Sequence, residues 1–533
     1  MKKYICLILA LVVVIAGITL SKNSKKDEPT TEVGETTSEI ASTSAAAAPI
    51  EYNITIGFYA GKSLNPFKTQ SLINRNLSTL LYDPLFLCDE TYTAEPLIAV
   101  SASVQGKKIV VEIDSEASFS DGSAITPSDV VYSFRRAKNS PLYQQRLSNF
   151  TSAHEGESSV TFILSKTDVF AVNCLNFPIV KQGTGDNSIP VGSGRYIYKR
   201  NKNGRYLQAN ENSTRGEVMS TEKIHLSEVS AAESELYMLQ TGDLSYFFED
   251  LSSSEAIKIG ANMIQVPLNN LVYLGFNSNN PHLKNKAVTD AIEYSIDKIT
   301  IADAAYKGMC SVAKSVFNPA WALINNEKLP EHEFSAVKAE QLLQENGYVY
   351  AYNNNKYRSK NFQFIEFDML VNSENASKVK CADIIAKQLR SIGIAINLRK
   401  LPFDEYTQAL SSGEFDLYLG EVKLGPNMSL HSFFTPGAGA SWGIDTNSTV
   451  AKASFDLSAG NIDVNTFIQV FNEEKPFIPI CYRSAIAYFS REMTFEGTVS
   501  EYEPLANIYS WEIGENQLTE AESQTETEET TNE

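Results

Sequence analysis

The clearest pattern of hydrophobic and polar positions lies between residues 379 and 419. At its start, hydrophobic residues recur at helical spacing, at Val379, Ala382, Ile385, Leu389 and Ile392. Gly393 then supplies a residue that readily adopts the left-handed conformation with which many helices end. The elements predicted next are a strand over residues 394–398, a short helix over 403–410 that Gly413 ends, and a strand over 415–419. This alternation of helices and strands predicts an α/β lobe with crossover connections.

The preceding part of the chain also mixes strands and helices. Alternating and apolar runs predict strands over residues 52–56, 108–113 and 160–164. A helix is predicted from Pro127, because Thr126 is a suitable N-cap and Asp129 stands where a capping box needs a carboxylate. Its apolar stripe consists of Val130, Phe134 and Ala137. Two further core-facing helices are predicted from Val288, Ile292 and Ile296, and from Val337, Leu342 and Leu343 before Gly347.

Composition narrows the class of protein. The chain has 533 residues, 43% of them hydrophobic, which is enough to bury large cores. Its 45 Lys and Arg against 64 Asp and Glu give a net charge of −19, which argues against nucleic acid or an anionic membrane surface as a partner. The six cysteines form no C-x-x-C pair and the five histidines are scattered. We therefore expect no disulfide scaffold, no metal site and no cofactor.

The two ends are predicted to lie outside the folded body. Residues 1–20, in which Lys2 and Lys3 precede an apolar run, are typical of a signal peptide or an N-terminal membrane anchor, and no lipoprotein cysteine follows. The composition of residues 21–50 predicts a disordered tether, and that of 517–533 an acidic disordered tail. The folded body is therefore expected outside the cytoplasm, tethered to the plasma membrane or released after cleavage of the signal.

Short motifs spread over residues 64–416 point to a known family. The longest, FSDGSAITPSDVVYSF over residues 119–134, resembles the signature F-S-D-G-T-P-[VL]-T-A-x-D-V-x-[YF]-[ST] of the family 5 extracellular solute-binding proteins, which are oligopeptide, dipeptide and nickel receptors of ABC importers. Further matches occur in the family's order: LNP at 64–66, LLYDPL at 80–85, EPLIA at 95–99, PVGSGRY at 190–196, LQTGDL at 239–244, GFN at 275–277, AIEYSID at 291–297 and GEFD at 413–416. Within PVGSGRY, Gly192 and Gly194 are expected to serve close backbone packing or a positive φ.

The resemblance implies an α/β, two-lobed periplasmic-binding-protein-like fold with an extra subdomain in lobe I and crossing hinge segments. Lobe I is expected over residues 51–87, 178–275 and 483–516, its subdomain over 88–177, and lobe II over 276–482.

The resemblance also indicates where a ligand would bind. In peptide-binding members, the segment after the strand at 415–419 resembles G-W-x-x-D-Y, lies in the cleft and supplies an Asp that pairs with the ammonium group of the peptide. Here Val422 and Gly425 stand at the Trp and Asp positions, and Glu421 is the nearby carboxylate. Glu421 is therefore either a replacement ligand contact or an exposed or ion-paired residue, with Lys423 as a candidate partner.

Five further residues are candidates for ligand contact. Lys423 and Asn427 lie in the same segment as Glu421. Arg483 follows an apolar run and is a candidate either for binding a carboxylate or for a structural salt bridge. Trp442 and Tyr59 are candidates for the wall of an aromatic pocket, with core packing as the alternative.

Motifs of enzymes are weak in this chain. Residues 439–443 satisfy G-x-S-x-G, but no predicted strand precedes them, and the last histidine, His431, comes before Ser441 rather than after it. Gly61-Lys62-Ser63 lacks the glycine that a phosphate-binding loop needs five residues earlier, and no H-E-x-x-H is present. Carboxylate pairs of the glycosidase type depend on spatial separation, so a secreted hydrolase stays open as an alternative.

The predicted function is the capture of a small solute, in the first place a peptide, between two lobes by hinge closure. The protein is expected to be a monomer that delivers its ligand to ABC permease subunits and catalyses no reaction. Alternative ligands are a sugar, a nickel chelate or a signalling peptide, and alternatives from other classes are the hydrolase and a surface adhesion module.

Overall fold

A computed structural model of the chain describes residues 54–202, 204–230, 232–251, 261–329, 333–350 and 356–513. All of them belong to one compact unit, Tyr52–Glu533. The predicted leader, tether and acidic tail lie outside the described residues. Within the described part of the chain, no helix is long and apolar enough to cross a membrane.

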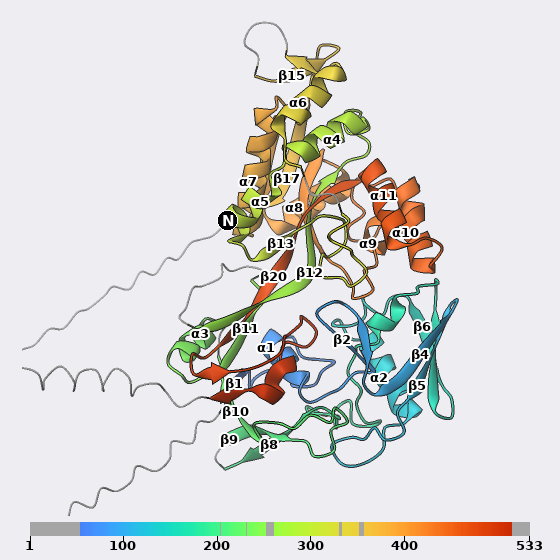
Figure 1. Cartoon of the computed structure of the whole chain (residues 1–533), viewed down its shortest axis with the longest axis vertical. Helices are drawn as coiled ribbons and strands as arrows, with labels where there is room; N and C mark the ends of the chain where they lie inside the picture. Colours follow the sequence, from blue (N-terminus) through green and yellow to red (C-terminus); the bar gives the residue numbers. More distant parts are fainter. Residues whose placement is uncertain are drawn as a thin grey trace, which may run out of the picture. The chain divides into compact units, whose positions relative to one another are not determined.

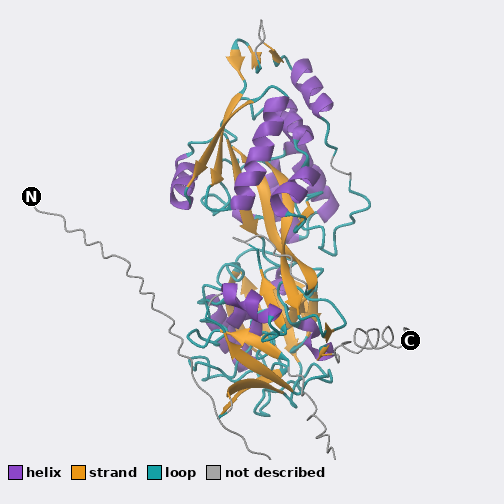
Figure 2. Cartoon of the chain, turned by 90° about the vertical axis from the view of Figure 1, so that its left-hand side faces the viewer, coloured by secondary structure: helices purple, strands orange, loops and turns teal. Residues whose placement is uncertain are grey.

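The described strands include eleven that form a single mixed sheet (Figure 1). In spatial order these are β18 (Ala395–Leu401), β17 (Glu366–Asn372), β19 (Leu417–Lys423), β12 (Asn262–Phe276), β20 (Phe477–Phe489), β11 (Tyr246–Glu249), β1 (Thr55–Phe58), β10 (Lys223–Glu228), β9 (Gly204–Ala209) and β8 (Tyr196–Asn201), with β13 (Cys310–Val312) pairing with β20 off this path. The long strands β12 and β20 are antiparallel neighbours near both ends, with the pairing interrupted between Pro267 and Leu271, and they cross between the two lobes (Figure 1; the same crossing joins the upper and lower halves in Figure 2).

Lobe I is built on β11, β1, β10, β9 and β8 together with the adjoining ends of β12 and β20. β1 pairs in parallel with β10 and β11, whereas β9 pairs antiparallel with β8 and β10. Its core buries side chains from distant parts of the sequence, among them Ile56, Leu226, Phe248, Phe489 and Trp511. The shorter elements of this lobe are α1 (Leu72–Ser78), α3 (Ala232–Gln240), η2 (Ala506–Ser510), β21 (Met493–Thr494) and β22 (Glu512–Ile513).

A subdomain of lobe I consists of a separate four-stranded antiparallel sheet and a helix that covers it. The sheet has the order β4 (Ala99–Gln105), β5 (Lys108–Ile113), β7 (Ser159–Leu164) and β6 (Phe150–Glu155), and the helix is α2 (Pro127–Lys138). Phe134 of α2 packs against three aromatic rings, with centroid separations of 6.2 Å to Phe150, 5.4 Å to Phe162 and 6.1 Å to Phe177. The hairpin of β2 (Phe86–Cys88) and β3 (Ala94–Pro96) and the short helix η1 (Ala171–Cys174) adjoin this subdomain.

Lobe II is an α/β layer structure. Parallel pairing of β17 with β18 and with β19 confirms the crossover connections that the hydrophobic pattern predicts. The helices of this lobe are α4 (Lys286–Ser295), α5 (Lys298–Tyr306), α6 (Ala336–Glu345), α7 (Ala376–Ser391), α8 (Phe403–Ser412), α9 (His431–Phe434), α10 (Thr449–Ala459) and α11 (Val464–Glu474). A small sheet of β14 (Val349–Tyr350), β15 (Arg358–Lys360) and β16 (Gln363–Phe364) lies beside α6 (Figure 1).

Both faces of the lobe II sheet are buried. Leu417 and Leu419 of β19 pack into the core that includes α4, α5 and α7, whereas Tyr418 packs into the core that includes α9, α10 and α11. The two helix groups lie on opposite sides of the sheet in Figure 1. Coverage on both faces explains why the start of β19 is a nearly continuous apolar run.

Several predicted elements are confirmed. The capping box of α2 forms, with the Thr126 N–H donating to Asp129 Oδ2 at 2.9 Å. α7 ends before Gly393 and α8 ends at Gly413, and both glycines have a positive φ. The strand predicted over residues 52–56 overlaps β1, which begins later, at Thr55, and continues to Phe58. Residues 52 and 53 lie outside the described part.

Two expectations for lobe II were wrong. β19 does not end at Leu419: it continues to Lys423, because β12 offers it partners as far as Asn270. Glu421 is therefore part of a paired strand rather than of a loop. Val337 does not face the core, since its side chain is 79% exposed, and α6 buries Ala339 and Leu343 instead.

The close approach of Gly194 to a neighbouring segment gives a first prediction. A Cβ atom added at Gly194 would lie 2.3 Å from the backbone oxygen of Leu80, which cannot move aside as a flexible side chain could. We expect Gly194→Ala to lower the free energy of unfolding by about 3 kcal/mol, as overpacking does. Urea denaturation of the purified protein measures this.

The matched control is Gly61→Ala, because a Cβ at Gly61 meets no atom within 4 Å. This variant should change the free energy of unfolding by less than about 0.5 kcal/mol. Equal stabilities of the two variants would show that the contact of Gly194 with Leu80 is not a packing constraint.

Candidate functional site

A cavity of about 620 Å³ is enclosed by parts of both lobes. Lobe I contributes α1 and the residues after it, its subdomain contributes residues on either side of β6 and β7, and the C-terminal segment contributes residues 501–504. Lobe II contributes the end of β19 and the loop that follows it, from Lys423 to Asn427, together with residues near α9. The cavity thus lies at the carboxyl end of a sheet strand, where α/β folds commonly bind ligands.

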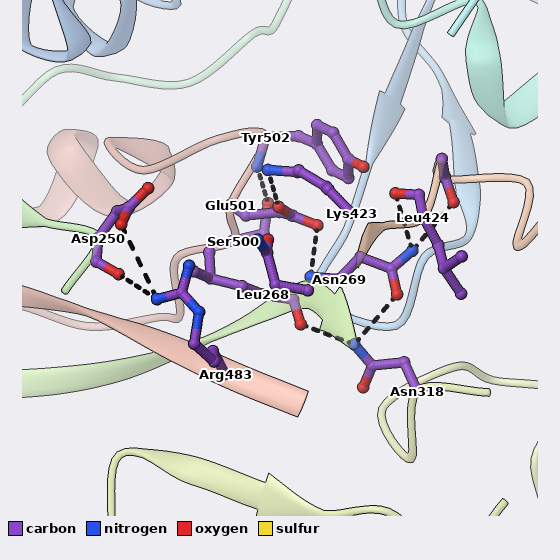
Figure 3. A network of polar contacts seen from close by, with 12 residues as sticks. Asp250, Leu268, Asn269, Asn318, Lys423, Leu424, Arg483, Ser500, Glu501 and Tyr502 are labelled. Atoms are coloured by element: carbon purple, nitrogen blue, oxygen red, sulfur yellow. Dashed lines mark hydrogen bonds and ion pairs between the residues drawn. The ribbon is translucent and has the colours of Figure 1, made fainter. Parts of the chain in front are cut away.

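Asn269 fixes the loop after β19 against the crossing strands (Figure 3). The pairing of β12 with β20 is irregular between Pro267 and Leu271, so Asn269 is released from the ladder. Its Nδ2 donates to the carbonyl oxygens of Gly425 at 2.9 Å and Leu424 at 3.3 Å. Because Asn269 is fully buried, these bonds hold the cavity wall in a defined position relative to the crossing strands.

An ion pair joins the two lobes at the edge of the cavity. Lys423 Nζ, at the end of β19, lies 2.6 Å from Glu501 Oε2, and the backbone N–H of Asn269 donates to Glu501 Oε1 at 3.1 Å (Figure 3). The Glu501 side chain is 2% exposed, whereas that of Lys423 is 52% exposed. The buried carboxylate therefore has a fixed position, and the lysine reaches it from solvent.

A second contact joins the subdomain to the same loop. Asp168 Oδ2 accepts a hydrogen bond from Asn427 Nδ2 at 2.7 Å, and Asp168 Oδ1 accepts one from the Phe170 N–H at 3.0 Å. Asp168 is 2% exposed and lines the cavity. Burial raises the pKa of Asp168 to about 6, although its two hydrogen bonds act in the opposite direction.

Two arginines also line the cavity. Arg146 lies with its guanidinium 4.9 Å from the ring centroid of Tyr502 and 5.6 Å from that of Tyr143, and its Nη1 donates to Asn176 Oδ1 at 2.5 Å. Arg75, at the end of α1, lies close enough for the two positive charges to affect each other. No sequence motif marks these arginines, which are 71 positions apart by their residue numbers and meet only in the folded chain.

The six predicted residues have different surroundings. Lys423 and Asn427 line the cavity, whereas Glu421, Arg483, Trp442 and Tyr59 are not among its described lining residues. Trp442 packs against a lobe II core, and its carbonyl accepts a hydrogen bond from the Tyr418 hydroxyl at 3.4 Å. The backbone N–H of Tyr59 donates to Asn74 Oδ1 at 2.9 Å, beside α1.

Glu421 and Arg483 come together beside the crossing strands. Glu421 Oε1 accepts hydrogen bonds from Arg483 Nε and from Asn270 Nδ2, both at 2.8 Å, and Glu421 Oε2 lies 2.9 Å from Lys378 Nζ. The proposed partner Lys423 pairs with Glu501 instead. Burial acts to raise the pKa of Glu421, but the charges of Lys378 and Arg483 outweigh it and lower the pKa to about 2.

Comparison with protein families identifies the class of this chain. A family model described as "Bacterial extracellular solute-binding proteins, family 5 Middle" matches residues 93–442, which is more than half of the chain. The chain belongs to this family.

Individual relatives agree with this assignment. The oligopeptide-binding protein AppA of Bacillus subtilis (strain 168) is 24% identical over 368 residues, which cover 64% of this chain and 67% of AppA.

Two solved structures share the two-lobed fold. The periplasmic murein tripeptide-binding protein MppA in its unliganded open form has a TM-score of 0.73 at 16% identity, covering 87% of this chain and 98% of MppA. NikA from Brucella suis in complex with Fe(III)-EDTA has a TM-score of 0.67 at 17% identity, covering 86% of this chain and 99% of NikA.

The buried ion cluster gives a second prediction. We expect Glu421→Gln to lower the free energy of unfolding by roughly 3 kcal/mol, because it leaves the half-buried Lys378 without its carboxylate and leaves the buried Arg483 with only the more distant Asp250, at 3.9 Å. The control is Glu366→Gln at an exposed position at the start of β17, which should have little effect. Chemical denaturation at pH 7 measures both, and equal stability of the two variants would contradict the assignment of Glu421 to a structural cluster.

Asp168 gives a third prediction, on pH dependence. A carboxyl group with a pKa of about 6 in the folded state and an ordinary value of 3.8 binds more protons when folded than when unfolded. Its contribution to stability is therefore largest below pH 3.8 and falls as the pH rises through about 6, by up to about 3 kcal/mol. In Asp168→Asn this contribution is absent, so the difference in unfolding free energy between wild type and variant should change between pH 4 and pH 6.5. A difference that stays constant over this range would show that Asp168 titrates at its ordinary pKa.

Proposed function

We propose that this protein is the extracytoplasmic binding component of an ABC importer for peptides. The observation that carries the proposal is the cavity between the two lobes, at the carboxyl end of β19 and beside the crossing strands. Its volume of about 620 Å³ falls in the usual range for sites that enclose small ligands. Its lining includes donors, acceptors and charges of both signs, which suits a ligand with an ammonium group, a carboxylate and a polar backbone.

The donor set does not suit a bare metal ion, and the name of the curated relative favours a peptide. Among the described residues, no three His, Cys, Asp or Glu side chains are grouped so that they could hold a metal ion. The curated relative described above, AppA, is named for oligopeptide binding. Main-chain amides of a bound peptide can pair with backbone and side-chain groups of the wall, which gives affinity with little dependence on peptide sequence.

The mechanism is hinge closure around the ligand. The pairing of β12 with β20 is interrupted between Pro267 and Leu271, so the ladder has fewer hydrogen bonds at the crossing point and bends there at lower cost. Closure brings the loop of Lys423 to Asn427 toward α1 and the subdomain, and ligand binding shifts the population toward the closed state. As domain limits we keep those expected from the sequence: lobe I at 51–87, 178–275 and 483–516, the subdomain at 88–177 and lobe II at 276–482. The part of β12 from Leu271 to Leu274 falls inside the lobe I limits but packs into the lobe II cores.

The remaining parts of the proposal concern location and partners. The apolar run over residues 4–20 supports export, with the body tethered to the plasma membrane or released after cleavage. The body acts as a monomer and hands its ligand to ABC permease subunits. It catalyses no reaction, and the G-x-S-x-G serine supports this: Ser441 Oγ donates to the Ala438 carbonyl at 2.9 Å, in turns that no strand precedes.

Native mass spectrometry of the purified protein tests the proposal. We expect a fraction of the molecules to carry bound peptides, and added mixtures of tri- to pentapeptides to be captured and later released with unchanged mass. Released fragments would favour a hydrolase. An empty cavity in the presence of every peptide mixture would overturn the peptide assignment.

A further inference from the structure

Only some of the charged side chains around the cavity form ion pairs. Three carboxylates at its wall have a cation within reach: Glu501 lies 2.6 Å from Lys423, Glu503 lies 3.3 Å from Arg215, and Asp250 lies 3.9 Å from Arg483. Arg75 and Arg146 form no ion pair with any carboxylate in the described part of the chain. The wall also includes Lys166, which lies over the ring of Phe455, and Asp168, which accepts hydrogen bonds but forms no described ion pair. Arg75 and Arg146 are therefore the two guanidinium groups at the wall that no carboxylate of the described chain holds in an ion pair.

Arg146 is held in place before any ligand arrives. Its guanidinium packs beside the rings of Tyr143 and Tyr502 and donates to Asn176 Oδ1. A guanidinium has five N–H donors, and the described structure gives no acceptor for the others. Since these contacts fix the plane of the guanidinium, little side-chain entropy is lost when an anion binds to it.

Arg75 reaches the same cavity from the end of α1. Its side chain is accessible and has no hydrogen-bond partner in the described part of the chain. Withdrawal from bulk water lowers the pKa of Arg75 and the nearby charge of Arg146 lowers it further, whereas Asp250 and Glu501 act in the opposite direction. Two guanidinium groups that line one cavity and repel each other favour an anion between them.

We infer that Arg146 and Arg75 together bind a carboxylate of the ligand. The planar fork of each guanidinium matches the two oxygens of a carboxylate, which can accept parallel N–H bonds. This inference rests on the proposed peptide function and extends it, because it makes a free carboxylate a requirement and places that carboxylate on the lobe I side of the cavity. The C-terminus and an acidic side chain of a peptide share this chemistry.

Three pools of random tri- to pentapeptides test the inference by native mass spectrometry and calorimetry. The pools consist of free acids, of C-terminal amides without Asp or Glu, and of C-terminal amides with one Asp or Glu. We expect the free acids to bind roughly tenfold to a hundredfold more tightly than the amides without acidic residues, as hydrogen bonds to charged groups require. Binding of the amides that contain Asp or Glu would identify a side-chain carboxylate as the recognised group, and their failure to bind would identify the C-terminus.

Two variants assign the effect to residues. Arg146→Gln and Arg75→Gln should each reduce the preference for free acids over plain amides by about tenfold, whereas Arg135→Gln, at an exposed position on α2 outside the cavity, should keep it. The preference is a ratio of two affinities measured on the same variant, so it stays informative even if Arg146→Gln lowers the stability of the protein. Arg75→Gln removes no described side-chain hydrogen bond.

Equal binding of acids and plain amides by the wild type would overturn the inference and leave the peptide function standing. Binding of no pool would overturn both.

Discussion

The antiparallel pairing of β12 with β20 is the constraint on which the rest of the molecule depends. These strands contribute to the core of each lobe: Val266 and Phe489 are buried in lobe I, and Leu274 and Ile480 in lobe II. Neither lobe is therefore complete without them, and each lobe is fixed to a different end of the same ladder. On the proposed mechanism, we expect movement of one lobe relative to the other to be concentrated where that ladder is interrupted, and Asn269 at this point also holds the wall of the cavity. The geometry of the site and the mobility of the lobes thus have a common origin.

Charged side chains near the crossing strands have two different roles. Beside β20, Glu421 is surrounded by Arg483, Lys378 and Asn270, and its two oxygens are fully engaged by the protein. In the cavity, Arg75 and Arg146 form no ion pair with a carboxylate of the described chain. A cluster that satisfies itself stabilises the fold, whereas one that lacks a partner can bind one. This contrast explains why Glu421, the most conspicuous carboxylate near the family's ammonium-binding position, serves the framework.

Local signals were sufficient to predict much of the fold. The cap at Thr126, the glycine ends of α7 and α8 and the alternation after Gly393 are properties of a few adjacent residues, and local chemistry determined them. The length of β19 could not be predicted in this way, because its last residues are stabilised by β12, some 150 positions earlier in the sequence. The site was still less accessible: Lys423 and Asn427 were identified through the resemblance, but Asp168, Arg146 and Glu501 have no local motif and meet only through the tertiary structure. Val337 likewise could not be placed from local sequence: it is apolar and lies in the first turn of α6, but it is exposed in the folded chain.

The central claim is that the two lobes close on a ligand that leaves unchanged. The most direct measurement is the distance between spin labels attached at Glu157→Cys, in the turn between β6 and β7, and Glu405→Cys, on α8, in a background in which the partly exposed Cys310 is replaced by Ser. Double electron–electron resonance should show a distance distribution that shortens by several ångström and narrows when a binding peptide is added, and that returns to its original form when the peptide is removed. The same distribution with and without a peptide that binds by calorimetry would contradict closure of the two lobes.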